Sequence, residues 1–306
     1  MLHNDASTFE QIILRVAEDT GIEPSIIEKD YYVTLFLRRI IALQPNIIFK
    51  GGTSLSKCYK LINRFSEDID LNIETETHPS QGQRKALKKN IVSVIDEFGL
   101  VFVNPEGVRS RRDYNRYVID YPTVFPTDYL KENLIVETAV YIKAYPCVRL
   151  QASSLIYDYL KKNGYDNLID QYQLQPFEVN VQSADRTLID KVYALCDYYL
   201  DEKIQEHSRH IYDVYKLLSI VKIDDSLSQL AVAVYEERKP HVNCRSAKDG
   251  IVINALLQEI VDRAVYRQDY EDITRKLLFE DVSYKTAISA VQKIIDSKIF
   301  NIAKTA

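Results

Sequence analysis

The most informative stretch of the chain is Phe49-Lys-Gly-Gly-Thr-Ser-Leu-Ser-Lys57, followed closely by Glu67-Asp-Ile-Asp-Leu-Asn-Ile-Glu74. Before the glycines, Asn46-Ile-Ile-Phe-Lys50 is typical of a short buried strand. After them, apolar residues between Leu55 and Ile62 recur at helical spacing. In the second stretch apolar and polar residues alternate, which predicts a half-buried strand. The expected order is strand, glycine turn, helix and strand.

This alternation places Asp68 and Asp70 on the same polar face of the second strand. Alternate residues of a strand lie roughly 7 Å apart, so the two carboxylates can converge on one or two cations. Mg²⁺ prefers carboxylates, water and phosphate oxygens as ligands. Because such a pair is more often simply exposed to solvent, the case for a metal depends on its neighbours.

The neighbouring Gly51-Gly52 turn strengthens that case. Backbone amides in a glycine turn can cradle an anion, helped by the N-terminus of the helix that follows. Thr53 and Ser54 add two hydroxyls at the same place. A plain tight turn is an equally common use of two glycines. Beside an acidic pair, we interpret the turn as a phosphate site for metal-assisted phosphoryl chemistry.

Glu137 is the natural third carboxylate of such a site. It lies in the middle of Leu134-Ile-Val-Glu-Thr-Ala-Val-Tyr-Ile142, whose composition predicts another strand. A charge among apolar neighbours is unfavourable unless something pairs with it. A metal ion would satisfy Glu137, and a salt bridge to a nearby arginine would do so equally well.

Several polar residues in the second half are candidates for a site. Lys191 sits near the apolar stripe of a predicted helix, where an ammonium needs a buried partner or a substrate phosphate. Arg209 and Asp213 share one helix face, either as an ordinary ion pair or as a couple facing a nucleotide. His207 and His210 lack a cysteine or carboxylate at a spacing diagnostic of zinc, so we do not predict a zinc site.

The remaining pattern predicts the architecture. Residues 1–44 form a helical segment ahead of the first strand, and residues 116–121 form a further strand. Beyond about residue 184 only helical periodicity continues. We therefore predict an α+β protein with two domains. The first, residues 1–183, has a small mixed sheet flanked by helices, and the second, residues 184–306, is all helical.

Composition limits the functions that the chain can have. Its 306 residues suffice for one large domain or two packed ones. A net charge of −5 argues against non-specific coating of nucleic acid, which needs many Lys and Arg contacts to phosphates. Two local basic clusters remain, one with Arg84, Lys85, Lys88 and Lys89 and the other with Arg109, Arg111, Arg112 and Arg116. Because most such runs are solvated surface, each is only a weak sign of a phosphate-rich partner.

The sequence shows no sign of a membrane or secretory segment. No stretch reaches the roughly 20 apolar residues that span a bilayer, and the first residues lack the basic-then-apolar order of a signal peptide. The four cysteines are far apart and form no C-x-x-C pair, which favours free thiols in a reducing compartment. We therefore expect a cytoplasmic protein with no membrane partner.

Four motifs, taken in order, resemble a known family. They are Glu28-Lys-Asp-Tyr-Tyr-Val-Thr34, the glycine motif with Arg64-Phe-Ser-Glu-Asp-Ile-Asp-Leu71, Asp185-Arg-Thr-Leu-Ile-Asp-Lys-Val-Tyr-Ala-Leu195, and Ser208-Arg-His-Ile-Tyr-Asp-Val-Tyr215. The glycine turn with its aspartate pair resembles the first motif of the DNA polymerase β-like nucleotidyltransferases. The ordered set, over about residues 25 to 218, is similar to the AbiEii/AbiGii toxin family.

This resemblance implies a toxin of a bacterial toxin–antitoxin or phage abortive-infection system. Characterised relatives of this type add nucleotides from an NTP to the 3′ acceptor end of tRNA, which blocks aminoacylation and translation. The resemblance therefore implies a nucleotidyltransferase that uses Mg²⁺ or Mn²⁺. It also implies a tRNA acceptor and a cognate antitoxin protein encoded beside the toxin.

The resemblance also suggests roles for single residues. The metal ligands are Asp68 and Asp70, with Glu137 as the open third position, and the nucleotide-binding residues are Gly51, Gly52, Thr53, Ser54, Lys57, Lys191 and Arg209. Lys191 would neutralise the triphosphate, and Asp213 would be catalytic or would orient the nucleotide. The acceptor surface is not fixed by the family pattern, and our candidates for it are Arg109, Arg111, Arg112 and Arg116.

Two other functions stay open at this point. The same chemistry can modify a hydroxyl of a protein or of a small molecule instead of RNA. A catalytically silent module that holds a nucleotide or the antitoxin is the other alternative. Retention of Asp68, Asp70, Lys191 and Asp213 argues against it, since a lapsed enzyme need not keep them.

Overall fold

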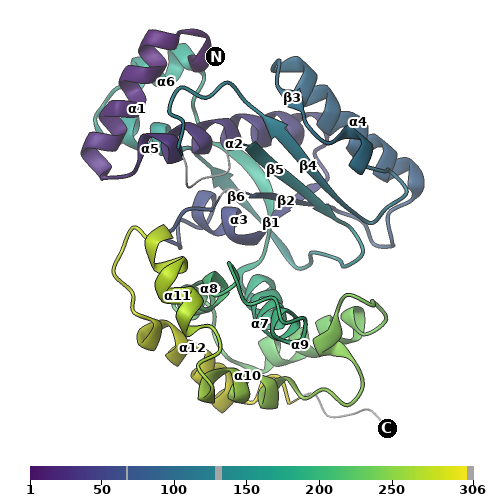
Figure 1. Ribbon diagram of the computed structural model, residues 1–306. Coiled ribbons are helices and arrows are strands. Elements are labelled where there is room, and N and C mark those ends of the chain that lie inside the picture. Colours follow the sequence, from purple (N-terminus) through teal and green to yellow (C-terminus); the bar gives the residue numbers. More distant parts are fainter. Residues whose placement is uncertain (67, 128–132, 302–306) are drawn as a thin grey trace. The chain divides into compact units, whose positions relative to one another are not determined.

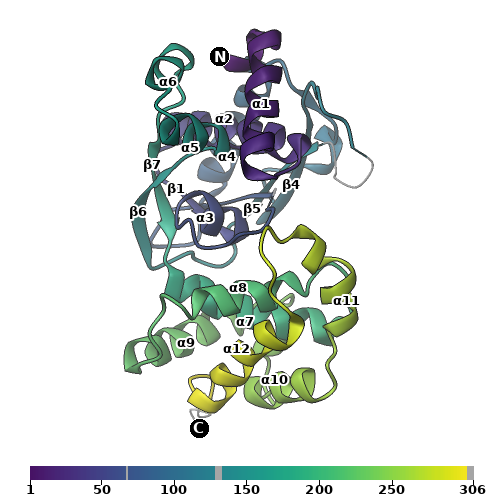
Figure 2. The same cartoon turned by 90° about the vertical axis from the view of Figure 1, so that its left-hand side faces the viewer.

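The computed structural model describes residues 1–66, 68–127 and 133–301, which fall into two compact units. The first comprises Met1–Lys60 and Ser66–Val181, and the second comprises Leu61–Phe65 with the chain from Gln182 onward. Figures 1 and 2 show that the sheet belongs to the first unit and that the second is built from helices. The predicted boundary after residue 183 falls close to this division, but the sequence pattern does not predict that Leu61–Phe65 joins the second unit.

The first unit is organised around one mixed sheet of seven strands. The strands are β1 (Ile47–Lys50), β2 (Asp68–Ile73), β3 (Val101–Phe102), β4 (Tyr114–Asp120), β5 (Asn133–Ala139), β6 (Cys147–Ala152) and β7 (Phe177–Gln182). Their spatial order is β3-β4-β5-β2-β1-β7-β6. The β2–β5 and β1–β7 pairs are parallel, whereas β1–β2 and β4–β5 are antiparallel. This confirms the predicted mixed sheet, although β3, β6 and β7 are strands that the periodicity does not reveal.

Helices make up most of the remaining described chain. In the first unit they are α1 (Ala6–Thr20), α2 (Pro24–Leu43), α3 (Gly51–Lys57), α4 (Gln81–Glu97), α5 (Leu155–Lys162) and α6 (Asp166–Tyr172). In the second they are α7 (Ala184–Leu200), α8 (Arg209–Leu217), α9 (Asp225–Arg238), α10 (Ile253–Asp262), α11 (Arg267–Asp272) and α12 (Tyr284–Ser297). Short 3₁₀ turns occur at Leu2–Asn4, Pro105–Gly107, Arg245–Ala247 and Thr274–Leu277. Within the described ranges, no helix has both the length and the apolar character needed to cross a bilayer.

The two faces of the sheet differ in character. One face packs against α1, α2, α4 and α5 to form the main core, to which β2 contributes Ile69 and Leu71. Asp68 and Asp70 alternate with these residues and are half-exposed. Because successive side chains of a strand point to opposite faces, both aspartates project from the face opposite the main core. The alternation predicted for this strand is therefore what positions the candidate site.

The segment Leu61–Phe65 is bonded into the helical unit. The backbone N–H of Phe65 donates to the carbonyl of Leu277 (3.0 Å), and that of Phe279 donates to the carbonyl of Asn63 (2.8 Å). A bridge between Arg64 and Leu278 lies between these two bonds. The five residues after Lys60 therefore belong to the second unit, and the chain from Ser66 onward, including β2, belongs to the first unit again.

Candidate active site

A row of charged side chains crosses four neighbouring strands on the face opposite the main core. In the strand register, Lys50 of β1 is paired with Asp70 of β2. Asp70 is paired with Glu137 of β5, and Glu137 with Arg116 of β4. Residues that are paired in register project from the same face of a sheet. Two acids therefore stand side by side, with a base on either flank.

The surroundings of Glu137 include the arginine partner that the sequence left open. Its Oε1 accepts a hydrogen bond from the Tyr114 hydroxyl (2.9 Å) and lies 3.6 Å from Nε of Arg116. Burial raises the pKa of Glu137, and the negative charge of Asp68 raises it further, while Tyr114 and Arg116 oppose the rise. Glu137 thus has an arginine on one side and acids that a cation can bridge on the other.

Asp68, Asp70 and Glu137 have the donor chemistry of a site for a hard divalent cation. All three offer carboxylate oxygens from one face of the sheet, and Mg²⁺ and Mn²⁺ favour such ligands. In the part of the chain that the structure describes, no three Asp, Glu, His or Cys side chains are grouped closely enough to hold a metal ion as they stand. By donor chemistry the aspartate pair suits a divalent cation, and Glu137 would have to release Arg116 and move to join it.

The glycine turn touches this acidic pair directly. Gly51 has φ +76°, in the left-handed region that residues with a side chain adopt reluctantly. A Cβ added to Gly51 would stand 2.0 Å from Oδ2 and 2.8 Å from Cγ of Asp70. The start of α3 and the Asp70 carboxylate are therefore in contact, with no room for any residue but glycine between them.

Thr53 and Ser54, predicted to bind phosphates, are fully buried in α3. The Thr53 hydroxyl donates to the Ser66 hydroxyl (3.0 Å), and the Ser54 hydroxyl donates to the carbonyl of Gly51 (2.8 Å). Gly52 is buried as well. Each hydroxyl thus bonds within the first unit, and both hold the glycine turn in place.

Lys57, also predicted to bind nucleotide, is buried at the other end of α3. Its Nζ contacts Oδ1 of Asp30 (2.5 Å), the Asp30 carbonyl (3.2 Å) and the Thr34 hydroxyl (2.6 Å), so all three N–H donors have acceptors in α2. Burial lowers the pKa of Lys57, which Asp30 opposes. The other Asp30 oxygen accepts from the backbone N–H of Leu155 at the start of α5 (2.8 Å). This geometry gives Lys57 and Asp30 a role in joining α2, α3 and α5.

A second cluster lies in the helical unit and is centred on Asp213. Arg64 binds both carboxylate oxygens, Nε to Oδ1 at 2.7 Å and Nη2 to Oδ2 at 2.9 Å. Nζ of Lys191 is 2.9 Å from Oδ2. The Asp213 side chain is fully buried, and that of Arg64 is nearly so. The structure thus brings Lys191 and Asp213 together, with Arg64 as a partner that helix spacing does not predict.

Opposite charges hold this cluster together. Burial by itself would raise the pKa of Asp213, but Arg64 and Lys191 hold it well below its ordinary value. Burial lowers the pKa of Lys191, while Asp213 opposes the shift. Lys191 donates to Asp213 and to Nδ1 of His210 (3.2 Å), and within the described residues no acceptor takes its third N–H. One donor of a mostly buried ammonium is therefore available to a substrate.

The two histidines of this region have different roles. His210 is buried, and because its Nδ1 faces the Lys191 ammonium, that nitrogen must accept. Burial and Lys191 hold the pKa of His210 well below its ordinary value. The His207 ring stacks on that of Tyr198 (3.5 Å between centroids), and burial and Arg209 lower its pKa to about 4. Both imidazoles are therefore neutral at pH 7, and Arg209 itself is half-buried at the start of α8.

Sequence reasoning missed four contributors to these clusters. Lys50 follows Phe49 of the core, so strand alternation was the signal that places it on the active face. His210 precedes Asp213 by three residues on one helix, and this spacing was a readable signal. Arg64 stands inside a quoted family motif without an evident role. Tyr114, at the first position of β4, carried no signal.

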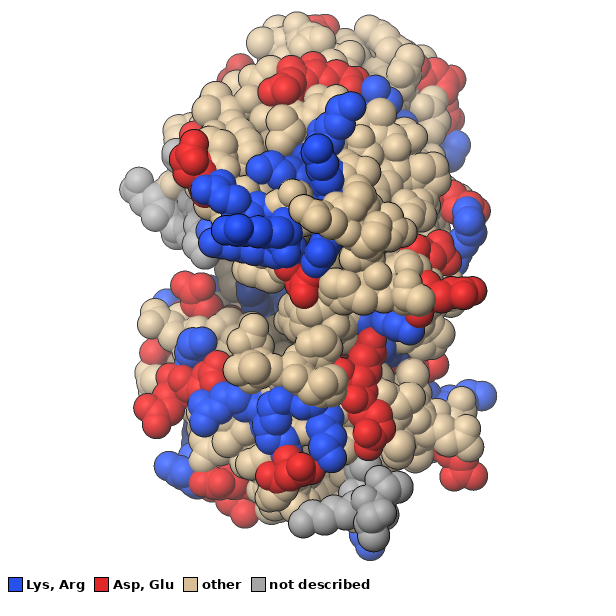
Figure 3. Space-filling view, turned by 90° about the vertical axis from the view of Figure 1, so that its right-hand side faces the viewer, with Lys and Arg blue, Asp and Glu red and all other residues tan. Residues whose placement is uncertain are grey.

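The predicted acceptor-binding arginines are distributed over one side of the first unit. Arg116 belongs to the charged row, whereas Arg109, Arg111 and Arg112 lie in the loop before β4. Figure 3 shows Lys and Arg side chains gathered on the face of the first unit that carries α4. These arginines are therefore part of a larger basic region.

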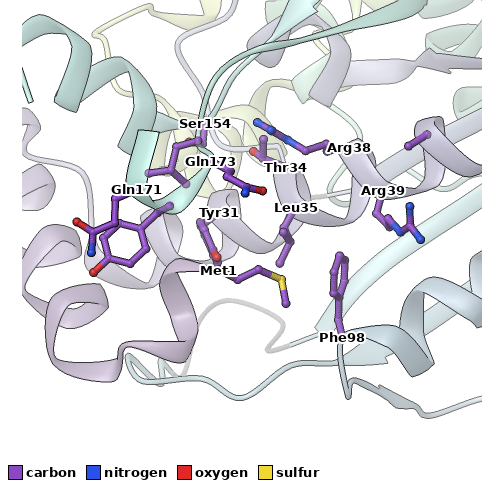
Figure 4. A pocket seen from close by; sticks show the side chains of 13 residues that line it. Met1, Tyr31, Thr34, Leu35, Arg38, Arg39, Phe98, Ser154, Gln171 and Gln173 are labelled. Atoms are coloured by element: carbon purple, nitrogen blue, oxygen red, sulfur yellow. The ribbon is translucent and has the colours of Figure 1, made fainter. Parts of the chain in front are cut away.

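A cavity of about 350 Å³ lies in the first unit, lined mainly from α2 and α6. Figure 4 shows Tyr31, Met1 and Phe98 among the side chains that surround it. Its arginines are engaged, since Arg38 donates to the Gln175 carbonyl and Arg39 pairs with Glu97 (2.7 Å). None of the three acids of the candidate site lines this cavity, so it is separate from the acidic pair.

Comparison with known proteins supports a specific family. A family model described as "Nucleotidyl transferase AbiEii toxin, Type IV TA system" matches residues 35–296. The chain belongs to the AbiEii family. Its resemblance to this family is thereby confirmed, and the chain is a member of a family of nucleotidyltransferase toxins of type IV toxin–antitoxin systems.

This AbiEii family member also resembles a solved structure in fold. The structure is of MenT4, a nucleotidyltransferase toxin from Mycobacterium tuberculosis H37Rv, with 17% sequence identity and a TM-score of 0.54. The similarity covers 93% of this chain and 88% of that chain. At this level of identity the likeness shows a shared fold. No curated protein matches the chain significantly.

Replacing Gly51 by alanine is expected to reduce nucleotide transfer by at least about a hundredfold. The added methyl group must displace Asp70 or the start of α3, and a shift of about 1 Å in a catalytic group can cost this much. The matched control is Gly21→Ala, since Gly21 also has positive φ (+71°) but nothing lies within 4 Å of the added Cβ. Steady-state rates should separate the variants, and equal rates would show that the contact is unimportant.

Replacing Glu137 by glutamine is expected to stabilise the metal-free protein by a few degrees at neutral pH. A raised carboxyl pKa means that the folded state holds the proton more tightly than the unfolded state, so Glu137 costs stability as the pH rises above its ordinary value of 4.5. The advantage of Glu137→Gln in EDTA should therefore grow from pH 5 to pH 8. Thermal melts at both pH values measure this difference.

Adding Mg²⁺ should make the melting temperature of the parent higher than that of Glu137→Gln. If Glu137 binds the cation, Mg²⁺ raises the melting temperature of the parent more than that of Glu137→Gln. Equal Mg²⁺ shifts would leave Asp68 and Asp70 as ligands and remove Glu137 from the metal site.

Proposed function

We propose that this protein is a Mg²⁺-dependent or Mn²⁺-dependent enzyme that transfers a nucleotide from an NTP to a 3′ hydroxyl of RNA. The observation that carries the proposal is the pairing of Asp70 with Glu137 in register, with Gly51 in contact with Asp70. Acids beside a glycine turn match what phosphoryl transfer requires, namely charge neutralisation and positioning. Family membership supports the same class of reaction.

In the proposed reaction the 3′ oxygen of the acceptor attacks the α-phosphorus, and the bond to pyrophosphate breaks. A cation held by Asp68 and Asp70 would neutralise charge on the attacking and leaving oxygens. Glu137 would serve as a third carboxylate ligand of that cation once Arg116 releases it, and the attacking hydroxyl would lose its proton to water. Gly51 and Gly52 would present backbone amides to the triphosphate.

Lys191 is the proposed cation for the triphosphate, through the N–H for which the described residues provide no acceptor. Asp213 is fully buried with both oxygens bonded, so we propose that it positions Lys191 and Arg64 and does not itself touch substrate. Only Phe65, Ser66 and Glu67 separate Arg64 from Asp68 in the chain. This short connection supports a role for both clusters in one reaction, with Arg209 as a further nucleotide contact.

We further propose that the acceptor is the 3′ end of tRNA and that the modification stops translation. A cognate antitoxin would neutralise the enzyme in the cytoplasm. Membership of a type IV toxin–antitoxin family supports the antitoxin and the toxic outcome. The basic region around α4 supports a polyanionic acceptor over a protein hydroxyl or a small molecule.

The deciding experiment incubates the protein with each α-labelled NTP and Mg²⁺, together with total RNA in one arm and a protein lysate in the other. We expect label in the tRNA band, at its 3′ end. Label in protein or in small molecules, and not in RNA, would show that the acceptor is a protein hydroxyl or a small molecule. Absence of label with all four NTPs in both arms would indicate a non-catalytic module that binds nucleotide or antitoxin.

A further inference from the structure

The two basic clusters of the sequence form one surface in the fold. Lys88 of α4 donates to the carbonyl of Val108 (2.9 Å), and Arg84 of α4 forms an ion pair with Asp113. These contacts tie the loop before β4 to the first half of α4. We call the result the α4 basic surface, which comprises Arg84, Lys85, Lys88, Lys89, Arg109, Arg111, Arg112 and Arg116. Figure 3 looks onto the side of the first unit that carries it.

The charge pattern of α4 opposes helix stability. The first ten residues of α4, Gln81 to Asn90, hold four bases and no acid, and Asp96 and Glu97 stand at its C-terminal end. A helix dipole favours the reverse arrangement, and like charges four residues apart, such as Lys85 and Lys89, repel each other. Because this pattern costs stability, a binding function is the better explanation for it.

The bases of this surface divide into two groups. Five contact protein groups: Arg84 with Asp113, Lys88 with the Val108 carbonyl, Arg109 with Glu106 (3.8 Å), Arg112 with the Gly107 carbonyl (2.9 Å) and Arg116 with Glu137 (3.6 Å). Lys85, Lys89 and Arg111 are exposed, and the described part of the chain gives them no hydrogen bond or ion pair. These three charges are therefore the ones available to an outside partner.

We propose that Lys85, Lys89 and Arg111 bind phosphates of the RNA acceptor, an inference that rests on the proposed function. A protein of net charge −5 with three unpaired bases on one surface can attract a polyanion locally without binding nucleic acid over its whole surface. Contacts of this kind fix the position of the RNA and do not read its sequence. Arg109 and Arg112 instead contact residues of the loop before β4, and Arg116 contacts Glu137 of the charged row.

The test measures binding of a fluorescent tRNA transcript by anisotropy at several salt concentrations. Loss of three phosphate contacts in Lys85→Gln/Lys89→Gln/Arg111→Gln should reduce the slope of log K against log [salt] by about 2–3. At 0.1 M salt this corresponds to binding weaker on the order of a hundredfold. An unchanged affinity and slope would overturn the inference.

A matched triple variant controls for net charge. Lys222→Gln/Lys285→Gln/Lys293→Gln removes three exposed bases of the helical unit and also changes the net charge from −5 to −8. This control should bind tRNA like the parent. Equal losses in the two triple variants would mean that total charge, and not the α4 basic surface, determines binding, which also overturns the inference.

Transfer assays separate this inference from the proposed function. If the parent labels RNA and the α4 triple variant labels it equally well at low RNA concentration, the surface assignment fails and the enzyme assignment stands. If the parent labels no RNA yet loses tRNA binding on substitution, the surface assignment stands and the proposed reaction fails. Intact RNA binding with lost antitoxin binding would assign the surface to the antitoxin and overturn the RNA inference.

Discussion

Replacing Asp70 by asparagine is expected to lower nucleotide transfer roughly a thousandfold while leaving the fold unchanged. A catalytic cation contributes several kcal/mol to transition-state stabilisation, and each ~1.4 kcal/mol is tenfold in rate. Asp70 is half-exposed and asparagine has nearly its shape, so the free energy of unfolding should change by no more than about 0.5 kcal/mol. Asp68→Asn should behave alike. Single-turnover labelling of RNA and a thermal melt measure the two effects.

The control for this experiment is a substitution of Glu74, which follows the same strand. Glu74 follows β2 at a position of the same parity, and its Oε2 accepts from Asn180 (3.1 Å). Glu74→Gln removes one negative charge near the sheet without touching the acidic pair, and it should leave transfer unchanged. Parental rates in Asp68→Asn or Asp70→Asn would show that the cation, if any, is held elsewhere.

Strand alternation explains why the acidic face was predictable. A period of two places Asp68 and Asp70 opposite Ile69 and Leu71 whatever the rest of the fold, so local pattern suffices. The apolar neighbours of Glu137 likewise mark it as a charge in need of a partner. The strand register that puts Glu137 beside Asp70, in contrast, joins residues far apart in sequence and needs the fold.

The polar side chains of the glycine motif have partners in the fold that residue type does not predict. Hydroxyls and a lysine after two glycines suggest phosphate contacts, yet Thr53, Ser54 and Lys57 bond within the first unit. The physical reason is that α3 is short and packed on both sides, so its polar groups must find partners inside. Sequence spacing gives no information about which acceptors, such as Asp30 of α2, will be near.

Long-range ion pairs mark a further limit of sequence reasoning. Arg64 and Asp213 are 149 residues apart, and helix spacing favours the nearer Arg209 as the partner of Asp213. A buried carboxylate takes the cation that can bind both of its oxygens, and the segment Leu61–Phe65 delivers Arg64 in that geometry. Only the path of the chain through the second unit determines this choice.

Asp213→Ala is expected to destabilise the helical unit by about 3–5 kcal/mol, because it leaves the Arg64 and Lys191 charges buried without their partner. A depressed carboxyl pKa adds stability above the ordinary value of 3.8 and loses it as the pH falls below that value. The difference in the free energy of unfolding between the parent and Asp213→Ala should therefore become smaller in strong acid. Urea unfolding at pH 7 and pH 3 measures this difference.

The control is an exposed ion pair of the same unit. Asp281→Asn, which removes an ion pair at a side chain that is 82% exposed, should cause no measurable change in the free energy of unfolding.

Replacing the whole cluster distinguishes stability from function. If Arg64, Lys191 and Asp213 are exchanged together for Met, Met and Leu, no charge of the three is left unpaired, and apolar substitution of a buried ion cluster is often neutral or stabilising. The triple variant should thus unfold at a urea concentration near that of the parent, yet transfer no nucleotide, because the cation proposed for the triphosphate is gone. Parental transfer in a folded triple variant would show that the cluster serves only the fold. Loss of transfer with stability retained would mean that the buried charges are kept for the reaction.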